Sequence, residues 1–318
     1  MNTISICIPI LNEENHIDDL LESLINTHHK DKEIVLIDGC STDNTVEKIR
    51  HWQSKYSNIK LIENHAVYVS HGFNKAFNMT ESKYIALIGA HAVYPKNYFA
   101  KGIEILDRNE SDAVGGPLIH KGKDWKGKII ANCMMSQFGV GDVKFRTSKE
   151  RGYVDSVPMA IYKREVFDKI GLFDEQLVRN QDDEFHYRLN DHGYRILMEP
   201  EMASIYFVRN NLLLLWKQYF SYGYYKPLVI KKVRSCIRAR HLVPASFVSY
   251  IITLPLLINY RYFFIIPLFF YIIIILILSL KYFNSLKDIL YSSMCFITLH
   301  ISYGLGFLLG IPRALHIK

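Results

Sequence analysis

Side chains that can hold a ligand or move a proton stand at four separate places in this chain. Each place follows a short apolar run or begins a helical pattern. Carboxylates and imidazoles accept hydrogen bonds, bind divalent cations and act as general bases, so the types alone permit group-transfer chemistry. Any one of these groups alone would be an ordinary polar side chain that faces solvent. In chain order the residues are Asn12, Glu13, Asp38, His91, Asp182, Asp183 and Glu184.

The elements that must position these residues alternate between strand and helix. Apolar runs without helical spacing predict strands, and helical patterns lie between them. This alternation predicts an α/β fold with a doubly wound, mostly parallel sheet. Because ligands bind at the carboxyl ends of the strands in such sheets, we expect the polar groups to gather at one edge. The predicted strands cover residues 4–10, 33–38, 59–62 and 84–88.

Gly89-Ala90-His91 forms the predicted floor of a ligand site. Small residues there let a ligand approach the backbone closely, and Pro95 ends the strand ladder. The alternative is a turn that holds a hydrogen-bonded histidine and binds nothing. A Gly-x-Gly-x-x-Gly motif is absent from the sequence, which argues against a dinucleotide site.

Charge and hydropathy change sharply in the last third of the 318 residues. From Met202 to Lys287 there is no Asp or Glu, and Lys and Arg crowd the start of that stretch. Since this basic run leads into apolar segments, we expect it to bind anionic membrane lipids and not nucleic acid. Five scattered cysteines and an N-terminus without a signal peptide favour a cytoplasmic location for the preceding domain.

The predicted domain boundaries follow this change in composition. Residues 1–208 form the catalytic domain, 209–241 an amphipathic basic interfacial segment, and 242–318 a membrane region. Phe263–Leu280 and Ser292–Ile311 are predicted to cross the membrane, and Leu242–Ile258 either crosses it or only re-enters. The predicted location is therefore the cell membrane, with several passes and a cytoplasmic catalytic domain. The side on which the C-terminus lies stays open.

Three motifs resemble the family-2 inverting glycosyltransferases with a GT-A fold. The stretch from Asp38 to Thr45 is similar to the family's Asp-x-Ser-x-Asp-x-Thr element. Ala90-His91-Ala92-x-Tyr94-Pro95, and Asp182-Asp183-Glu184 with Arg188, Gly193 and Tyr194, resemble membrane-attached exopolysaccharide glycosyltransferases of succinoglycan-biosynthesis type. The resemblance covers about residues 3–235 and implies a GT-A catalytic domain, an interfacial helix and C-terminal transmembrane helices.

The resemblance also implies a reaction. One sugar would pass from a nucleotide diphosphate sugar, expected to be a UDP-sugar, to a polyprenyl-diphosphate-linked glycan. Asp182 would be the base and Asp183 is the alternative; a non-catalytic interpretation has these acids only cap their helix and pair with Arg188 or Arg195. Supporting roles fall to Glu184, Arg188 and Gln218. The residues implied for the nucleotide sugar are Pro9, Asn12, Glu13, Asp38, Asn74, Gly89, Ala90 and His91.

One departure from the family bears on the cofactor. The family's Asp-x-Asp motif holds Mn²⁺ or Mg²⁺, and here Gly89 and His91 replace its acids. His91 is thus the candidate metal ligand, and imidazole suits Mn²⁺ better than Mg²⁺. Alternatively, basic side chains neutralise the leaving group, or the chain is a catalytically impaired membrane scaffold.

Product length is a second open point. The processive synthases of this superfamily carry Gln-x-x-Arg-Trp, and the segment at Gln218 lacks the Arg-Trp. Its absence favours transfer of a single sugar. A polyprenyl-phosphate sugar synthase and a processive polysaccharide synthase remain the alternative enzymes.

Overall fold

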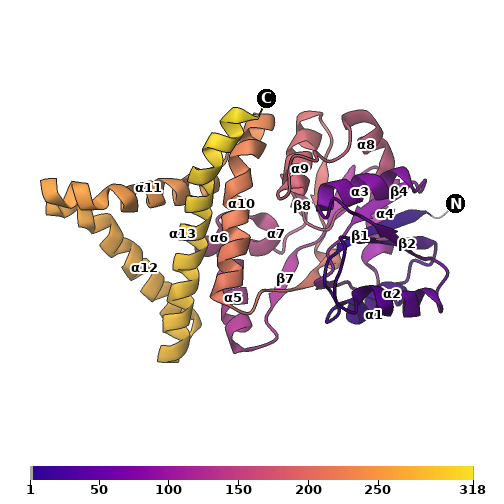
Figure 1. Ribbon diagram of the computed structural model, residues 1–318, viewed down its shortest axis with the longest axis horizontal. Helices are drawn as coiled ribbons and strands as arrows, with labels where there is room; N and C mark the ends of the chain where they lie inside the picture. The colour runs from indigo at the N-terminus through magenta and orange to yellow at the C-terminus, as the bar shows by residue number, and fades with distance from the viewer. Residues whose placement is uncertain (1–2, 318) are drawn as a thin grey trace. The chain divides into compact units, whose positions relative to one another are not determined.

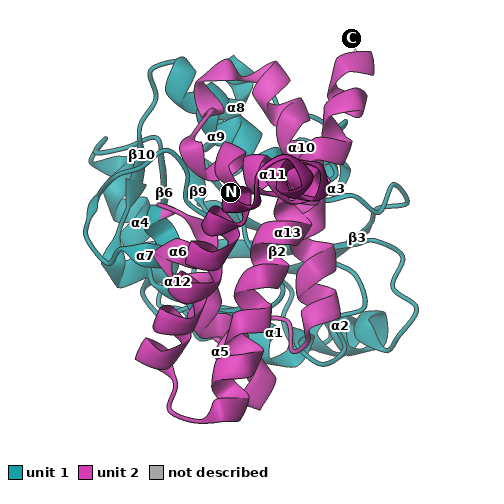
Figure 2. Cartoon of the chain, turned by 90° about the vertical axis from the view of Figure 1, so that its left-hand side faces the viewer, with its two compact units in different colours: residues 1–119, 144–206 teal, residues 120–143, 207–318 magenta. Residues whose placement is uncertain are grey.

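The computed structural model describes residues 3–317, which fold into two units (Figures 1 and 2). Unit 1 holds the residues up to Ile119 together with Lys144–Tyr206. Unit 2 holds His120–Val143 and the residues from Phe207 onward. The sequence-based boundary at residue 208 places residues 120–143 with the catalytic domain. They lie in unit 2 because Ile129 and Met134 pack in one apolar cluster with residues near the C-terminus.

Unit 1 is built on an eight-stranded sheet in the order β3-β2-β1-β4-β9-β6-β10-β8. The pairs β2–β3, β1–β2, β1–β4 and β6–β10 are parallel, while β9 runs antiparallel to both neighbours and β8 runs antiparallel to β10. The predicted mostly parallel α/β sheet is therefore confirmed. The strands are β1 (Ile4–Ile10), β2 (Lys32–Asp38), β3 (Ile59–Glu63), β4 (Tyr84–Leu87), β6 (Ala113–Gly115), β8 (Gly152–Tyr153), β9 (Ile161–Lys163) and β10 (Ile196–Met198).

Helices cover both faces of this sheet, because side chains alternate along each strand. In β1, Ile6 and Ile8 join one apolar cluster with Leu20 of α1, whereas Cys7 joins a second cluster with Phe73 of α3. This arrangement is a doubly wound one. The helices of unit 1 are α1 (Ile17–Ile25), α2 (Thr45–Gln53), α3 (Val69–Asn78), α4 (Tyr98–Asp107), α7 (Lys144–Thr147), α8 (Arg164–Ile170), α9 (Gln181–Asp191) and the 3₁₀ turn η1 (Pro200–Met202).

A small second sheet follows the polar end of β4. Its order is β5-β11-β7, with β5 at Ala92–Val93, β11 at Ser204–Phe207 and β7 at Leu118–Lys121. β5 pairs antiparallel with β11, so the chain leaving β4 is fixed directly after His91. The turn between β6 and β7 is fixed by close packing of two backbone segments, because a Cβ on Gly116 would lie 2.0 Å from the carbonyl oxygen of Met202.

Unit 2 is helical, and its two long helices α10 and α13 run side by side in both views (Figures 1 and 2). They pack at glycines: a Cβ on Gly306 would lie 2.2 Å from the carbonyl oxygen of Phe220, and one on Gly223 would lie 2.1 Å from that of Tyr303. The elements are α5 (Trp125–Met135), α6 (Gln137–Val140), α10 (Leu212–Lys232), η2 (Arg234–Cys236), α11 (Ala239–Tyr260), η3 (Tyr262–Ile265), α12 (Ile266–Tyr282) and α13 (Leu286–His316).

Three segments of unit 2 are long and apolar enough to cross a membrane. They are Ala239–Tyr260, Tyr262–Tyr282 and Leu286–His316, with mean hydropathies of 1.8, 3.0 and 1.8. The sequence predicts that Phe263–Leu280 and Ser292–Ile311 cross the membrane, and it leaves open whether Leu242–Ile258 crosses or only re-enters. By length and composition this first segment also qualifies, since α11 runs for 22 residues.

Candidate active site

The loops that follow β1 and β2 are hydrogen-bonded to each other. Ser41 Oγ accepts the backbone N–H of Asn12 at 2.9 Å, and Asn12 Oδ1 accepts that of Thr42 at 2.8 Å. Asp38, buried at the end of β2, accepts the N–H of Ser41 with both carboxylate oxygens at 3.2 Å. Asn12 adopts the left-handed backbone conformation (φ 55°), which asparagine tolerates well. Asp38 and Asn12 thus belong to one fixed edge of the sheet.

Gly89-Ala90-His91 lies next to that edge, after β4. β4 ends at Leu87, one residue earlier than the predicted strand, and the N–H of Gly89 donates to the hydroxyl of Tyr94 at 3.0 Å. A Cβ on Gly89 would lie 3.0 Å from the Met159 terminal methyl carbon, which belongs to the segment leading into β9. The loop is therefore held from two sides, and a side chain at position 89 would meet only the flexible end of Met159.

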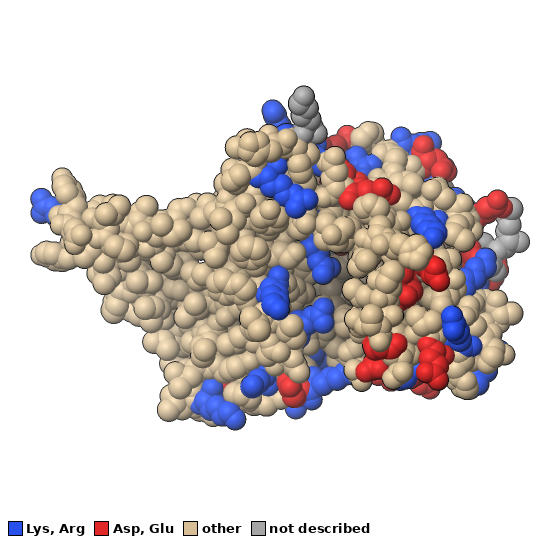
Figure 3. Space-filling model, in the orientation of Figure 1, with Lys and Arg blue, Asp and Glu red and all other residues tan. Residues whose placement is uncertain are grey.

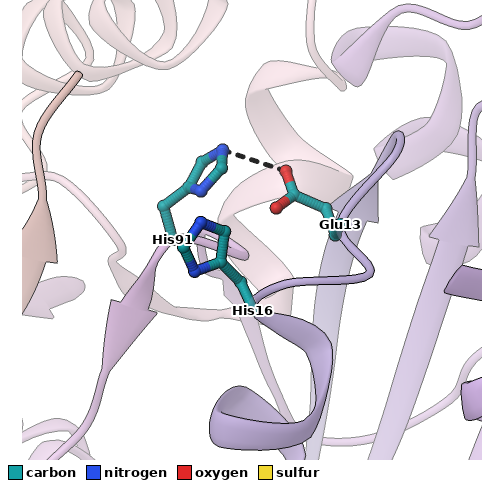
Figure 4. A group of neighbouring side chains, drawn as sticks. All are labelled: Glu13, His16 and His91. Carbon is teal, nitrogen blue, oxygen red and sulfur yellow. Dashed lines mark ion pairs between the residues drawn. The ribbon is translucent and has the colours of Figure 1, made fainter. Parts of the chain in front are cut away.

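Glu13, His16 and His91 form a group of possible metal ligands (Figure 4). Glu13 Oε1 lies 3.0 Å from His91 Nε2, and the His16 and His91 rings meet edge to face with centroids 4.8 Å apart. One ligand atom from each of the three residues lies within 4.8 Å of the other two. Glu13 is buried, and its Oε2 has no hydrogen-bond partner among residues 3–317.

The first turn of α9 carries Asp182 and Asp183 against β9. Burial, with a smaller contribution from the charge of Asp182, raises the pKa of Tyr162 in β9 well above its usual value. Burial lowers the pKa of His186 to about 4, against the opposing charge of Asp183. Both acids are therefore within electrostatic reach of the buried Tyr162–His186 pair. Tyr162 pairs with Ile85 of β4, so the strand that α9 contacts is the neighbour of the strand that leads to His91.

Glu184 and Arg188 hold α9 to its surroundings. Glu184 is buried, and its Oε1 accepts a hydrogen bond from Arg188 Nε at 2.8 Å. Arg188 also donates to the carbonyl of Leu172 at 2.7 Å and to that of Ile170. The pairing that the non-catalytic interpretation expected therefore occurs at Glu184. Its result is a fixed position for the first turn of α9.

Three further predicted site residues have defined positions elsewhere. Pro9 lies within β1, opposite Ile37. Asn74 is buried in α3, where its amide nitrogen donates to the carbonyl of Phe173 at 2.9 Å and its oxygen accepts that residue's N–H at 3.1 Å. The nitrogen and the oxygen of the Asn74 amide thus both form hydrogen bonds within the chain. Gln218 lies in α10 of unit 2 and donates to the Tyr222 hydroxyl at 3.1 Å.

A shallow depression lies away from these residues, on α1 and α2. Asp18, Glu47 and His51 are among the side chains that line it, and none of the predicted site residues does. The neighbouring strands β2, β1 and β4 instead bring Asp38, Glu13 and His91 to the same edge of the sheet.

His16 was missed by the sequence reasoning, although a signal was present. Glu13 and His16 stand three residues apart at the start of a helical pattern, a spacing that puts two side chains on one face. The N–H of His16 donates to the carbonyl of Glu13 at 2.9 Å, which fixes that turn just before α1.

Comparison with protein families identifies the fold and the class of reaction. The family described as Glycosyl transferase family 2 matches residues 5–171, more than half of the chain. The chain belongs to glycosyl transferase family 2. It is therefore a glycosyltransferase, as the motifs at Asp38, His91 and Asp182 predicted.

Two relatives of this glycosyltransferase match it over most of their length. It is 31% identical over 242 residues to a dolichyl N-acetyl-alpha-D-glucosaminyl phosphate 3-beta-D-2,3-diacetamido-2,3-dideoxy-beta-D-glucuronosyltransferase from Methanococcus voltae, covering 73% of this chain and 75% of the relative. It is 30% identical over 244 residues to succinoglycan biosynthesis protein ExoA from Rhizobium meliloti, covering 76% of this chain and 74% of that protein. The predicted likeness to proteins of the succinoglycan type is confirmed.

A solved structure shares the fold. The mannosyltransferase PcManGT from Pyrobaculum calidifontis, in complex with GDP-Man and Mn²⁺, superposes with a TM-score of 0.60 at 15% identity. The likeness covers 96% of this chain and 87% of that one. It confirms the GT-A fold that the sequence predicted for this glycosyltransferase.

Proposed function

We propose that this glycosyltransferase moves a single sugar, with inversion, from a nucleotide diphosphate sugar to a polyprenyl-diphosphate-linked glycan of the cell envelope, a capsule or an exopolysaccharide. The observation that carries the proposal is the gathering of Asp38, Glu13 and His91 at the carboxyl ends of β2, β1 and β4. Ligands bind at this edge in doubly wound sheets. We expect a UDP-sugar as the donor, with Asp38 contacting the uracil or ribose.

The proposed acceptor follows from the chain's relatives and from its apolar helices. One relative is named for a reaction on a dolichyl-linked sugar phosphate and another for succinoglycan biosynthesis. Three helices of this chain could also cross a membrane, where a polyprenyl carrier would reside. These observations support a lipid-linked glycan as the acceptor.

We propose Asp182 as the general base, with Asp183 as the alternative. Inverting transfer is a single displacement at the anomeric carbon, and it needs a base that takes the proton of the acceptor hydroxyl. The first turn of a helix stabilises an ionised carboxylate, which keeps such a base ready to accept a proton. Glu184 and Arg188 would support the site by fixing this turn.

The donor would lie over the loops after β1, β2 and β4. Gly89 and Ala90 would let the backbone approach the sugar diphosphate, and Pro9 and Asn12 would shape the first loop. We leave Asn74 out of the proposed donor site, because both polar atoms of its amide already bond to Phe173.

A divalent cation fits the residues present. Glu13 Oε2 is buried without a hydrogen-bond partner in the described part of the chain, and His91 approaches the other oxygen of that carboxylate. Glu13 and His91 would hold the ion, which when bound would neutralise the departing diphosphate. Mn²⁺ suits this nitrogen-containing set better than Mg²⁺.

We further propose that the protein is a multi-pass membrane protein whose catalytic unit is cytoplasmic. Basic residues at the end of α10 and beyond, among them Lys231, Lys232 and Arg234, are exposed. They would contact the anionic lipids of the cytoplasmic leaflet, which attract such clusters.

Transfer by membranes that contain the full chain tests the reaction. Membranes would be supplied with a panel of radiolabelled UDP- and GDP-sugars and with polyprenyl-diphosphate-linked acceptors, and lipid-linked product would be counted. We expect Asp182→Asn to lower kcat by roughly 10²- to 10⁴-fold. Asp191→Asn, at the other end of α9, is the matched control and should transfer normally.

Normal transfer by the variants of both acids would contradict the proposal. If Asp182→Asn and Asp183→Asn both transfer as fast as the parent chain, neither acid is the base. Products longer by many sugars would favour a processive synthase, and labelled polyprenyl phosphate without a diphosphate acceptor would favour a polyprenyl-phosphate sugar synthase.

A further inference from the structure

The group formed by Glu13, His16 and His91 has the features of a cation site that the protein makes by itself. The Glu13 carboxylate bonds to His91 through Oε1, while Oε2 is buried and has no hydrogen-bond partner among residues 3–317. A buried carboxylate oxygen without a partner costs about 1–3 kcal/mol or more. A bound cation would remove that cost.

The backbone holds two of these ligands in place before any ligand arrives. The N–H of Glu13 donates to Thr45 Oγ1 at 2.7 Å, and the N–H of His16 donates to the carbonyl of Glu13 at 2.9 Å. His91 comes from a different loop, which the hydrogen bond between Gly89 and Tyr94 secures. Figure 4 shows the three side chains converging from these two loops.

The donor types determine which cation fits. Two imidazoles and one carboxylate are borderline-soft ligands that suit Mn²⁺, Fe²⁺, Co²⁺ or Zn²⁺, whereas Mg²⁺ prefers oxygen ligands alone. Three protein ligands also leave coordination positions open for water or phosphate oxygens.

We propose that Glu13, His16 and His91 together bind one first-row transition-metal cation in the absence of nucleotide sugar. A cation site that lacked His16 would depend much more on the donor's own phosphates. The use of this ion in sugar transfer rests on the proposed function, but its binding to the protein does not.

Titration of the full-length protein with the metal alone tests the proposal. Tag-free protein in detergent would be titrated with MnCl₂, and free Mn²⁺ would be followed by electron paramagnetic resonance. We expect one Mn²⁺ per chain, and Mg²⁺ competing more weakly by about tenfold or more. Glu13→Gln and His16→Ala should each weaken Mn²⁺ binding by more than about tenfold. His51→Ala, an exposed histidine on α2, is the control and should bind as the parent does.

Each result separates this proposal from the proposed function. Equal Mn²⁺ affinity in His16→Ala, or Mg²⁺ bound as tightly as Mn²⁺, overturns the three-residue site even if the protein transfers sugar. If the protein binds Mn²⁺ as expected but transfers no sugar, the result supports the metal site and contradicts the proposed function. Thermal unfolding of Glu13→Gln, which preserves side-chain shape, checks that lost binding is not lost folding.

A different observation carries a second proposal, on how unit 2 meets the bilayer. The helices α11 and α12 project from the pair formed by α10 and α13 (Figures 1 and 2). Within their apolar windows 22% of α11 and 11% of Tyr262–Tyr282 are buried, against 50% of α13. Figure 3 shows this projection as an almost uncharged surface. The sequences 241–260 and 262–280 contain no Asp, Glu, Lys or Arg.

α13 has polar neighbours that a hydrocarbon layer would exclude. Near its N-terminus Asp288 accepts a hydrogen bond from Trp125 of α5 at 2.6 Å. α5 also carries the exposed Lys126 and Lys128. Farther along, α13 packs at Gly306 directly on α10, whose Lys217 is exposed. Placing a lysine in hydrocarbon costs about 2.5–3.5 kcal/mol or more. If α13 crossed the bilayer, it would bring several lysines of its neighbouring helices into the hydrocarbon layer, each at that cost.

We propose that α11 and the segment Tyr262–Tyr282 cross the bilayer as a hairpin, while α10 and α13 stay at the near surface. The 22 residues of α11 span about 33 Å at 1.5 Å per residue, enough for a hydrocarbon core of about 30 Å. Tyr260, Arg261 and Tyr262 are exposed at the turn and would lie in the far headgroup region. Tyrosine and arginine are favoured at that depth. Both ends of α13 would then lie on the cytoplasmic side.

Cysteine labelling in intact cells tests this topology. On a Cys40→Ser background, which removes the one exposed cysteine of the described residues, single cysteines would be placed at Tyr260, Ser285 and His316. A membrane-impermeant maleimide should label Tyr260→Cys in intact cells, and Ser285→Cys and His316→Cys only after permeabilisation. His316→Cys labelled from outside would mean that α13 crosses. Tyr260→Cys protected until permeabilisation would mean that the hairpin does not cross. Either result overturns the proposal.

Discussion

Acidification should destabilise unit 1 through His186, and the size of the effect follows from its surroundings. The ring is buried, with Nδ1 3.0 Å from Ser156 Oγ and Nε2 2.8 Å from the Tyr162 hydroxyl. Burial lowers the pKa of His186 to about 4 from 6.5, and only the charge of Asp183 opposes this shift. The folded unit therefore keeps the ring neutral where the unfolded chain takes up a proton.

The direction of the effect follows from that difference. Because the folded pKa lies below the unfolded one, the contribution of His186 to stability is fully present above pH 6.5. It is lost as the pH falls toward 4, since only the unfolded chain binds a proton in that window. We expect His186 alone to remove about 2 kcal/mol from the free energy of unfolding between pH 7 and pH 5. Near pH 4 the loss approaches about 3 kcal/mol.

Pulse labelling of Cys7 gives an assay specific to unit 1. Cys7 is fully buried in β1, so it reacts only when that unit opens. The full-length protein in detergent would be equilibrated in urea at pH 7 and pH 5. It would then be labelled briefly with a dithiodipyridine, which reacts at acidic pH, and Cys7 modification would be measured by mass spectrometry. Between these two pH values, the free energy of unfolding of the His186→Gln variant should fall by about 2 kcal/mol less than that of the parent chain.

A variant on the same helix separates this effect from general acid sensitivity. His192 is exposed at the end of α9, and His192→Gln should keep the parent's full dependence on pH. If His186→Gln loses as much stability as the parent between pH 7 and pH 5, the buried imidazole is not the cause and the reasoning fails.

Three other substitutions have definite expected outcomes. Gly89→Asp restores an acid in the loop after β4 and meets only the flexible end of Met159, so we expect a folded protein in which Mg²⁺ supports transfer better; unchanged metal preference in transfer assays would contradict this. Gly306→Leu places a side chain against the backbone at Phe220, so we expect the free energy of unfolding to fall by about 1–3 kcal/mol or more, measured by thermal unfolding in detergent. Leu309 is exposed, so Leu309→Ala should change the stability little. Asp31→Asn weakens the hydrogen bond that Asp31 accepts from the backbone N–H of Thr3, because the amide keeps one oxygen but loses the charge. Since Asp31 is exposed, we expect the free energy of unfolding to fall by less than about 0.5 kcal/mol, measured by urea unfolding.

The part of the fold that the sequence predicts well consists of local patterns. Ile4–Ile10 and Glu33–Asp38 are apolar runs, and both are strands that pair in parallel. Their polar ends meet because parallel strands share an edge, so the sequence alone predicts that Asn12 and Asp38 lie together. β9 could not be placed in the same way. Its three residues are too few to show a direction, and pairing with β4 and β6 makes it antiparallel.

Asn74 illustrates a limit set by contacts distant in sequence. It lies in the helix before the strand that leads to Gly89, and the family resemblance implied a role for it in binding the nucleotide sugar. Its amide instead bonds to Phe173, 99 positions away, and nothing in the helix itself indicates that partner. A polar side chain that is buried must find a partner, but the sequence does not say whether the partner is a ligand or the chain's own backbone.

The same limit applies to the helices of unit 2, where length and hydropathy describe a helix and not its neighbours. Leu286–His316 is apolar enough to cross a membrane, as the segment Ser292–Ile311 predicted. Gly306 and Gly310 of this helix, however, face α10 so closely that a Cβ on Gly310 would lie 2.1 Å from the carbonyl oxygen of Tyr224. Glycines that seat a helix against a second, lysine-bearing helix require both helices to share one environment. Because the lysines of α10 and α5 need water or headgroups, the partners of α13, more than its own composition, determine where it can lie.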